Sequence, residues 1–350
     1  MNIFISKKRR GFAVIIALVA VTVLTLLAGA FAYSMKVETR LAQNSDSDEQ
    51  LLWLGRAGVE RARWILSLEP PGVSSLKQIW AGGSGEGPET NGPLAGISLD
   101  NFQVGEGTVS LKFVELESKI NINSPTTDKA LLTQVLTAQG VDASEISVVS
   151  DSILDWIDPD DATRPAGAES DYYQGQVPPY YAKNAPIDDP SELLLIKGIT
   201  LPMFKGGSAA NDMGAAFQHH HLGFGNAPGQ APDYPFGLVD VFTQFSSGKI
   251  NILTADANVL ALIPGMDTAA VQALLTARDS DPPIRDVGRL LAAAGIVNQA
   301  AIGQIQNYVG TQGNTYEVHV TAHIGDYSRE FVAVLFRNGP NVDVFSFYWK

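Results

Sequence analysis

Residues 7–35 decide how this chain is built, and they read KKRRGFAVIIALVAVTVLTLLAGAFAYSM. Four basic residues precede Gly11 and Phe12, and no formally charged residue follows until after Met35. A helix of about 24 residues is about 36 Å long, which is enough to cross a hydrocarbon core of about 30 Å with some tilt. Because basic flanks stay in the cytoplasm, we expect a single pass through a membrane, with the bulk of the chain outside the cytoplasm.

The junction between Gly11 and Phe12 differs from an ordinary secretory signal, in which cleavage follows the apolar segment. Cleavage after Gly11 would remove the basic residues and keep the membrane helix. This order resembles the leader of type IV pilins and type II secretion pseudopilins, in which a membrane peptidase cuts after the glycine and the new terminal phenylalanine is methylated. The resemblance makes Gly11 and Phe12 the expected processing site, and a plain amino-terminal anchor is the alternative.

The apolar spacing continues beyond the membrane segment to Ile65, which predicts one long helix. We expect it to end near Glu69, because Pro70-Pro71-Gly72 cannot continue a helix. Strand patterns then stand at both ends of the remaining chain, around a mostly helical middle. They cover residues 102–104 and 109–114, joined by a turn at 105–107, and residues 316–322, 331–337 and 342–348.

The helical middle contains an internal repeat, because KINI occurs at 119–122 and again at 249–252. Each copy precedes a short helical pattern, at 128–139 and at 256–263. The second copy continues through Ile263-Pro264-Gly265-Met266 into further helical patterns and resembles a helix-hairpin-helix unit. Such units often bind nucleic acid, but the formal charge of −13 disfavours that partner. We therefore interpret the repeat as a packing unit.

The most specific pattern lies between residues 151 and 198. It begins with DSILDWIDPDD at 151–161 and continues with GAE at 167–169, YY at 172–173, AKN at 182–184 and EL at 192–193. Together with the two KINI segments, this series resembles the minor pseudopilin K family of type II secretion, over roughly residues 9–337.

The resemblance implies an α+β, pilin-like fold. A long amino-terminal transmembrane helix would pack on an antiparallel sheet, and a large helical domain with SAM-like or helix-hairpin-helix-like units would be inserted. The expected divisions are a leader at 1–11, the transmembrane part at 12–35, the first pilin-like part at 36–123, the inserted helical domain at 124–246 with a flexible loop at 204–235, and a helical unit followed by the last strands at 247–350.

The resemblance further implies a non-enzymatic subunit that caps the tip of a periplasmic pseudopilus and helps to initiate its assembly. Its implied partners are the minor pseudopilins of the I and J types, the major pseudopilin and the prepilin peptidase. Ile16 fits a terminal position, because most pilin-like subunits carry at that place a glutamate that meets a neighbouring amino terminus. The alternatives are a type IV pilus minor pilin and, from a different class, a membrane-anchored periplasmic enzyme.

Calcium in the inserted domain is also implied by the resemblance, with Asp158, Asp160, Glu169 and Asp171 as candidate ligands. Oxygen-rich turns suit Ca²⁺, which takes six to eight oxygen ligands, although the spacing does not match an EF-hand. Each acid has an alternative role as a helix cap or a solvated charge. Asp155, on the helix side of this cluster, is one such structural acid.

Other chemistry has weaker support in the sequence. The absence of cysteine excludes disulfides and thiol catalysis. A glycosidase would need two carboxyl groups that face a sugar site, but we expect Trp156, Tyr172 and Tyr173 to pack in the core. The histidines at 219–221 lie in the Gly/Ala/Asn/Pro-rich stretch 204–235, which we interpret as a flexible loop rather than a metal site.

Overall fold

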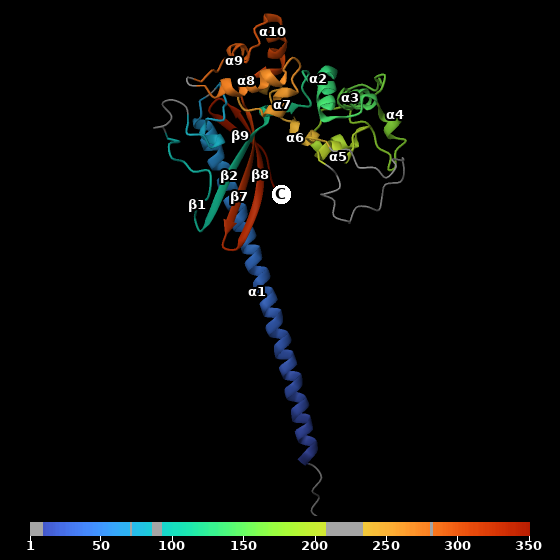
Figure 1. Cartoon of the computed structure of the whole chain (residues 1–350). Helices are drawn as coiled ribbons and strands as arrows, with labels where there is room; N and C mark the ends of the chain where they lie inside the picture. Colours follow the sequence, from blue (N-terminus) through green and yellow to red (C-terminus); the bar gives the residue numbers. More distant parts are fainter. Residues whose placement is uncertain (1–9, 71, 86–92, 208–233, 281–282) are drawn as a thin grey trace, which may run out of the picture.

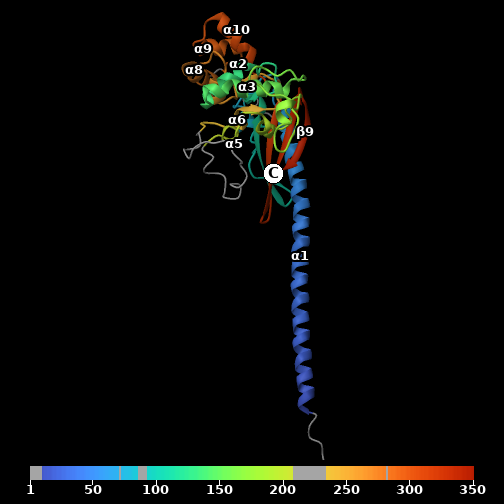
Figure 2. The ribbon, with the colours of Figure 1, turned by 90° about the vertical axis from the view of Figure 1, so that its right-hand side faces the viewer.

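The computed structural model describes residues 10–70, 72–85, 93–207, 234–280 and 283–350. One helix, α1 (Arg10–Leu68), runs through most of the length of the molecule (Figure 1). At 1.5 Å per residue it is about 90 Å long. A sheet lies along its carboxyl-terminal half, and the remaining helices gather at the end farthest from its free half (Figures 1 and 2). The sequence prediction that α1 ends before Pro70 is confirmed.

The two halves of α1 have different surroundings. The span Phe12–Arg40 has a mean hydropathy of 2.7, is long and apolar enough to cross a membrane, and buries none of its surface within the chain. From Leu51 onward the helix buries one face against the sheet, with Leu54, Val59 and Ile65 in the core. A single helix therefore supplies both an apolar free segment and the spine of a folded domain.

The sheet has five antiparallel strands in the order β1-β2-β7-β8-β9. Its strands are β1 (Phe102–Val104), β2 (Gly107–Glu115), β7 (Thr315–Ile324), β8 (Tyr327–Asn338) and β9 (Asn341–Trp349). The predicted turn at 105–107 joins β1 to β2, with Gly105 at φ +58°. The β2–β7 pair, in which Leu111 lies opposite Val320, joins segments about 200 residues apart.

Two helical glycines set the distance between α1 and the sheet. A Cβ atom on Gly55 would lie 2.6 Å from the Phe331 ring, and one on Gly58 would lie 2.4 Å from Val320 Cγ1. Glycine is a weak helix former, so its presence in the buried face reflects this close approach. The alternating inward residues of β2, β7 and β8 then fill one apolar core with α1.

The helical region enters after β3 (Ile120–Asn121). Its elements are α2 (Lys129–Gln139), α3 (Ala143–Ile157), α4 (Ser170–Tyr173), α5 (Leu201–Lys205), α6 (Leu238–Val241), α7 (Ala257–Ala261), α8 (Thr268–Arg278), α9 (Val287–Ala293) and α10 (Gln299–Tyr308). Aspartate side chains accept backbone N–H groups at the starts of α2, α3, α7, α8 and α9. Five of the 37 acidic residues of the chain therefore cap these helices. The 26 residues 208–233, which include the histidines 219–221, lie outside the described residues.

The two KINI segments have equivalent local structures. In the first, β3 pairs in parallel with β4 (Phe242–Thr243), and in the second, β5 (Ile250–Asn251) pairs in parallel with β6 (Val309–Gly310). Asn121 Oδ1 accepts the Asn123 N–H at 2.9 Å, and Asn251 Oδ1 accepts the Leu253 N–H at 3.0 Å. The predicted repeat is therefore one motif used twice: a short strand, an asparagine turn and an aspartate-capped helix.

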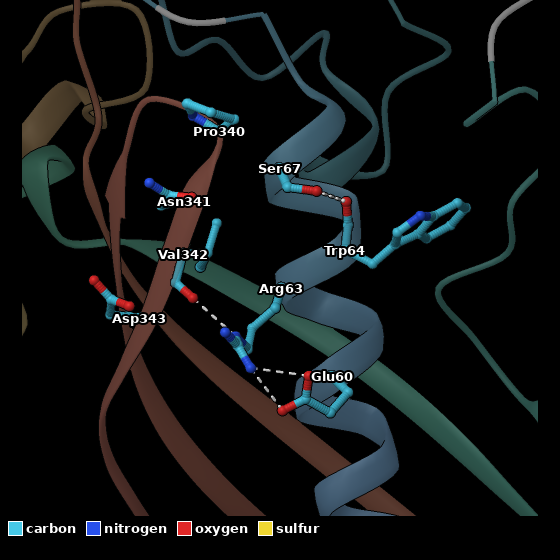
Figure 3. Close-up of a pocket in the computed structure, with 8 residues that line it drawn as sticks. All are labelled: Glu60, Arg63, Trp64, Ser67, Pro340, Asn341, Val342 and Asp343. Carbon is cyan, nitrogen blue, oxygen red and sulfur yellow. Dashed lines mark hydrogen bonds and ion pairs between the residues drawn. The ribbon is translucent and has the colours of Figure 1, made fainter.

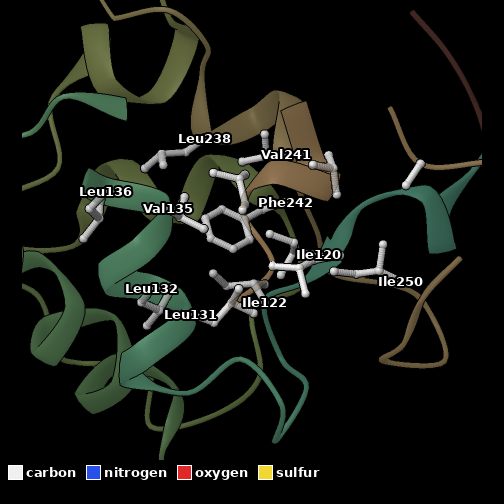
Figure 4. Packing of buried hydrophobic residues seen from close by; sticks show 14 of the residues in the cluster. Ile120, Ile122, Leu131, Leu132, Val135, Leu136, Leu238, Val241, Phe242 and Ile250 are labelled. Carbon is white, nitrogen blue, oxygen red and sulfur yellow. The ribbon is translucent and has the colours of Figure 1, made fainter. Parts of the chain in front are cut away.

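One apolar core joins both copies of this repeat. Ile120, Ile122 and Phe242 pack beside Leu132 and Val135 of α2, and Ile250 of the second copy lies next to them (Figure 4). The same cluster extends through α7, α8 and α10. The helical elements before and after residue 246 thus share one packed interior.

Two buried glutamates link this region to the sheet. Glu115, at the end of β2, accepts both contacts from Asn251 Nδ2, at 3.0 and 3.2 Å. Glu117 accepts the Ser247 N–H and the Thr315 N–H, each at 3.0 Å. Burial raises the pKa of Glu115 from 4.5 to about 7, against the opposing effect of its hydrogen bonds to Thr254 and Asn251.

Candidate functional site

The acidic segment begins where α3 ends. Asp155 lies in the last turn of α3 and is fully buried. Its carboxylate accepts the Ala168 N–H at 2.9 Å and Arg164 Nη1 at 2.7 Å. A Cβ atom on Gly167 would lie 1.9 Å from Asp155 Oδ2, so only glycine allows this loop to close over the carboxylate. The predicted structural role of Asp155 is confirmed.

Arg164 forms the positive centre of this segment. Its Nη1 group contacts both Asp155 and Asp158, the residue that follows the last turn of α3. The guanidinium therefore neutralises the acids nearest to the helix end. The remaining Asp158 oxygen, Oδ1, is buried and has no hydrogen-bond partner.

Glu169 is the most unusual acid of the segment. Only 3% of its surface is exposed, and neither carboxylate oxygen has a hydrogen-bond partner. Burial, followed by the nearby carboxylates with Asp155 first, raises the pKa of Glu169 from 4.5 to about 7. A buried carboxylate without partners is costly, so this position favours either a proton or a cation.

Asn184 brings a further oxygen to the same region. Its Nδ2 group donates to the Asp160 carbonyl at 3.1 Å and to Asp161 Oδ1 at 2.8 Å. Its side-chain Oδ1 is buried without a partner. Asn184 also has a left-handed backbone, with φ +47°. The residue belongs to the AKN element of the sequence pattern, but that pattern alone did not identify it as a site residue.

The four predicted ligands occupy different environments. Asp158 and Glu169 bury partnerless oxygens, whereas Asp160 is exposed and accepts the Ala162 N–H at 2.8 Å. Asp171 is exposed on α4. Within the described ranges, no three side chains of His, Cys, Asp or Glu lie close enough together to hold a metal by themselves. A cation here would need the amide and backbone carbonyl oxygens that Ca²⁺ also accepts.

The burial of the aromatic residues near this segment was predicted correctly only in part. Trp156 and Tyr173 are buried and pack edge to face with centroids 5.2 Å apart. Tyr172, expected in the core, is instead 41% exposed, and Lys197 Nζ lies 4.9 Å from its ring centroid. A four-residue helix cannot bury both adjacent tyrosines on one side, because neighbouring residues point about 100° apart.

The two histidines of β7 share a face, as their spacing predicts. His319 contacts Glu317 and Glu330, each at 2.8 Å, and His323 is exposed. The hydrogen bond with Glu317 is the main cause that raises the pKa of His319, against the effect of its partial burial. His319 thus takes part in an ion-pair network on the polar face of the sheet.

The membrane-facing candidate residues lie at the start of α1. Phe12 and Ile16 are exposed on the helix, at 71% and 54%. Ile16 therefore offers a neutral surface where a carboxylate would stand in most pilin-like subunits. The leader residues 1–9 lie outside the described residues, and cleavage after Gly11 stays a prediction.

Comparison with known proteins gives a consistent result. Two models of one family, described as type II secretion system (T2SS) protein K, match residues 115–206 and 250–312. Type II secretion system protein K of Aeromonas hydrophila is 25% identical over 57% of this chain and 61% of its own length. Type II secretion system protein K of Klebsiella pneumoniae is 22% identical over 57% of this chain and 60% of its own length. The chain thus spans about three-fifths of the length of these relatives.

A solved structure extends the likeness to the fold. A chain in the crystal structure of the GspK-GspI-GspJ complex from the enterotoxigenic Escherichia coli type 2 secretion system superposes with a TM-score of 0.64 at 17% identity. The match covers 88% of this chain and 99% of the other. The α+β, pilin-like fold with its helical addition is therefore the fold of both proteins. Over the two segments that the family models match, the chain is similar to type II secretion system protein K, and it shares the fold of this solved structure.

Proposed function

We propose that this chain is a minor pseudopilin that caps the tip of the periplasmic pseudopilus and helps to initiate its assembly for export of folded proteins. One observation carries the proposal. The helical region stands at the end of the sheet opposite to the free apolar half of α1 (Figures 1 and 2). In a fibre of parallel α1 helices, that mass would occupy the place of the next subunit.

The free half of α1 supports the membrane side of the proposal. Its 29-residue apolar span would cross the inner membrane once, with the basic residues at 7–10 in the cytoplasm and the folded domain in the periplasm. Cleavage between Gly11 and Phe12 by a prepilin peptidase would leave Phe12 as a methylated terminus. The neutral Ile16 would give no carboxylate to a neighbour, which suits a subunit used once rather than repeatedly.

Partners of the I and J types follow from the likeness to a protein solved together with GspI and GspJ. We propose that this chain forms the corresponding tip complex and acts without catalysis. The test is co-extraction of the full-length chain with I-type and J-type subunits from membranes, combined with export in a strain that lacks it. Recovery of all three and loss of export on deletion are expected. Normal export without this chain would overturn the proposal.

We further propose a calcium ion near Glu169. Glu169 and Asp158 would hold it together with the side-chain carbonyl of Asn184, and Asp160 and Asp171 remain predicted ligands. The partnerless oxygens support this assignment. Calcium at about 100 times Kd would stabilise the fold by about 2.7 kcal/mol, so the melting temperature should fall when a chelator is added. Glu169→Gln should remove this response. An unchanged melting temperature, with no heat of binding in calorimetry, would refute the site.

A further inference from the structure

The outer edge of β9 has no paired strand among the described residues. The five-stranded sheet ends at β9, a strand of nine residues, whereas the opposite edge is the three-residue β1. Asp343 is the only charged residue on β9, and the strand contains neither lysine nor proline. Natural proteins commonly protect edges of this length with such residues. The pairing of β9 with β8 shifts register between Val334 and Leu335, which leaves Phe345 as an extra residue, and on either side of this shift the edge is suited to accept another strand.

Hydrogen-bond geometry shows which backbone groups point outward. The Lys350 N–H donates to the Glu330 carbonyl on β8 at 3.1 Å. Because inward and outward groups alternate along an antiparallel strand, those of Trp349 and Phe347 face away from β8. At the other end, Arg63 Nε donates a hydrogen bond to the Val342 carbonyl at 2.8 Å. Val342 thus also faces outward, and so does Val344, two residues on.

A hydrophobic groove borders this edge on one side. Its volume is about 530 Å³, and Phe336, Phe345 and Val344 of the sheet line it together with Phe245 of the helical region. Phe245 and Phe345 meet edge to face with centroids 4.9 Å apart. Phe345 is nevertheless 67% exposed. An apolar side chain from a neighbouring strand could be buried here.

A polar pocket of about 410 Å³ borders the same edge on the side of α1 (Figure 3). Arg63 spans it and contacts both carboxylate oxygens of Glu60 at 2.9 Å, so these two charges compensate each other. Asp343 lines both this pocket and the hydrophobic groove, and it is exposed. The remaining charge at the edge is therefore negative, which favours a basic side chain on the occupant.

We propose that the outer edge of β9 receives an extended segment of a partner pilin-like subunit, with an apolar side chain in the Phe345 groove and a lysine or arginine beside Asp343. Only an extended chain can satisfy the outward N–H and C=O groups of Phe347 and Trp349 and, beyond the register shift at Phe345, those of Val344. Alternate side chains of such a strand point to opposite faces, which matches the groove and the pocket on the two sides of β9. The inference rests on the proposed function, because it names the surface by which the tip complex is held.

The test uses the full-length chain co-expressed with the I-type and J-type subunits and extracted in detergent. Phe345→Lys and Asp343→Lys place a positive charge at the edge, and each should reduce the recovered partner by about tenfold or more. Val297→Lys is the matched control, because Val297 is an 80% exposed apolar residue outside the sheet. Its complex should be recovered in wild-type amount. The melting temperature of each variant shows that the fold is kept.

A crosslink supplies a second readout without a disruptive charge. The chain has no cysteine, so Trp349→Cys introduces a single thiol at the exposed edge. It should crosslink to an I-type or J-type subunit that carries a cysteine on an extended segment. If the wild-type chain recovers no partner, the proposed function itself fails. If complexes form and the edge variants recover them unchanged, or if the thiol links only to a second copy of this chain, the β9 inference is wrong and the proposed function stands.

Discussion

Replacement of Glu115 by glutamine should remove most of the pH dependence that this residue gives to stability. Glu115 is fully buried where the sheet meets the second KINI segment, next to Asn251, Thr254 and Ser74. Glu117 places a second negative charge near Glu115, and Glu115 in turn interacts electrostatically with Tyr316 of β7. Tyr316 also interacts with the buried Arg337 of β8. Glutamine keeps the shape of the side chain and stays neutral.

The magnitude follows from the two proton affinities. The pKa of Glu115 is about 7 in the folded chain, against an ordinary value of 4.5. At about 1.4 kcal/mol per tenfold change in affinity, the free energy of unfolding falls by about 3–4 kcal/mol as Glu115 loses its proton in the folded state. The folded chain binds more protons than the unfolded chain over this range, so stability decreases as pH rises from 4.5 to 7. Most of this loss, about 2–3 kcal/mol, should fall between pH 5 and pH 8.

The assay is thermal unfolding of the full chain in detergent, followed by near-ultraviolet circular dichroism. Between pH 5 and pH 8 the melting temperature of Glu115→Gln should rise by about 3–5 °C relative to that of the wild type. Glu106→Gln, in the exposed turn between β1 and β2, is the control and should follow the wild type at both values. A wild-type pH profile in Glu115→Gln would refute the reasoning, because it would mean that Glu115 titrates normally in the fold.

Three further perturbations test the packing and the ion pairs. Gly58→Ala should destabilise the fold by about 1–3 kcal/mol, because the new Cβ would meet Val320. The control is Gly303→Ala, whose Cβ would meet nothing within 4 Å and which should stabilise the fold slightly. Equal melting temperatures of the two variants would argue against close contact between α1 and the sheet. Asp155→Ala should lower the free energy of unfolding by about 3–5 kcal/mol, because a buried, paired carboxylate is lost. The control, Asp326→Ala in an exposed turn, should be almost neutral. A small loss of stability for Asp155→Ala in thermal melts would contradict the structural role of Asp155. His319→Gln should destabilise the fold by about 1 kcal/mol or less. The loss should be larger at pH 6 than at pH 9, because the stability that the raised pKa of His319 gives is lost as pH rises through that pKa. A loss of stability that does not depend on pH would refute the ion-pair assignment.

Local signals in the sequence predicted much of the fold. The end of α1 at Pro70, the turn at Gly105 and the two KINI motifs depend on residues adjacent in the chain, and each was found as expected. The sheet order could not be read in this way, because the register of β2 on β7 depends on contacts across about 200 residues. The pilin-like resemblance supplied the architecture that periodicity alone could not.

The candidate site was predicted less completely. The density of acids marked the segment that contains Asp158 and Glu169, but it did not show which oxygens lack partners. That distinction depends on Arg164, which satisfies Asp155 and one oxygen of Asp158. Asn184 belongs to the candidate site only because the fold brings it next to Asp160 and Asp161. Tyr172 was misplaced because a tyrosine pair gives no signal of which ring faces inward.

The most direct test of the central claim is the position of this chain in isolated pseudopili. Pseudopili assembled with the full-length chain, tagged at the carboxyl terminus, can be labelled with gold and imaged by electron microscopy. The tip assignment predicts label at one end of each fibre and none along the shaft. Label that repeats along the shaft would contradict it, because the helical region could not then block the addition of a further subunit.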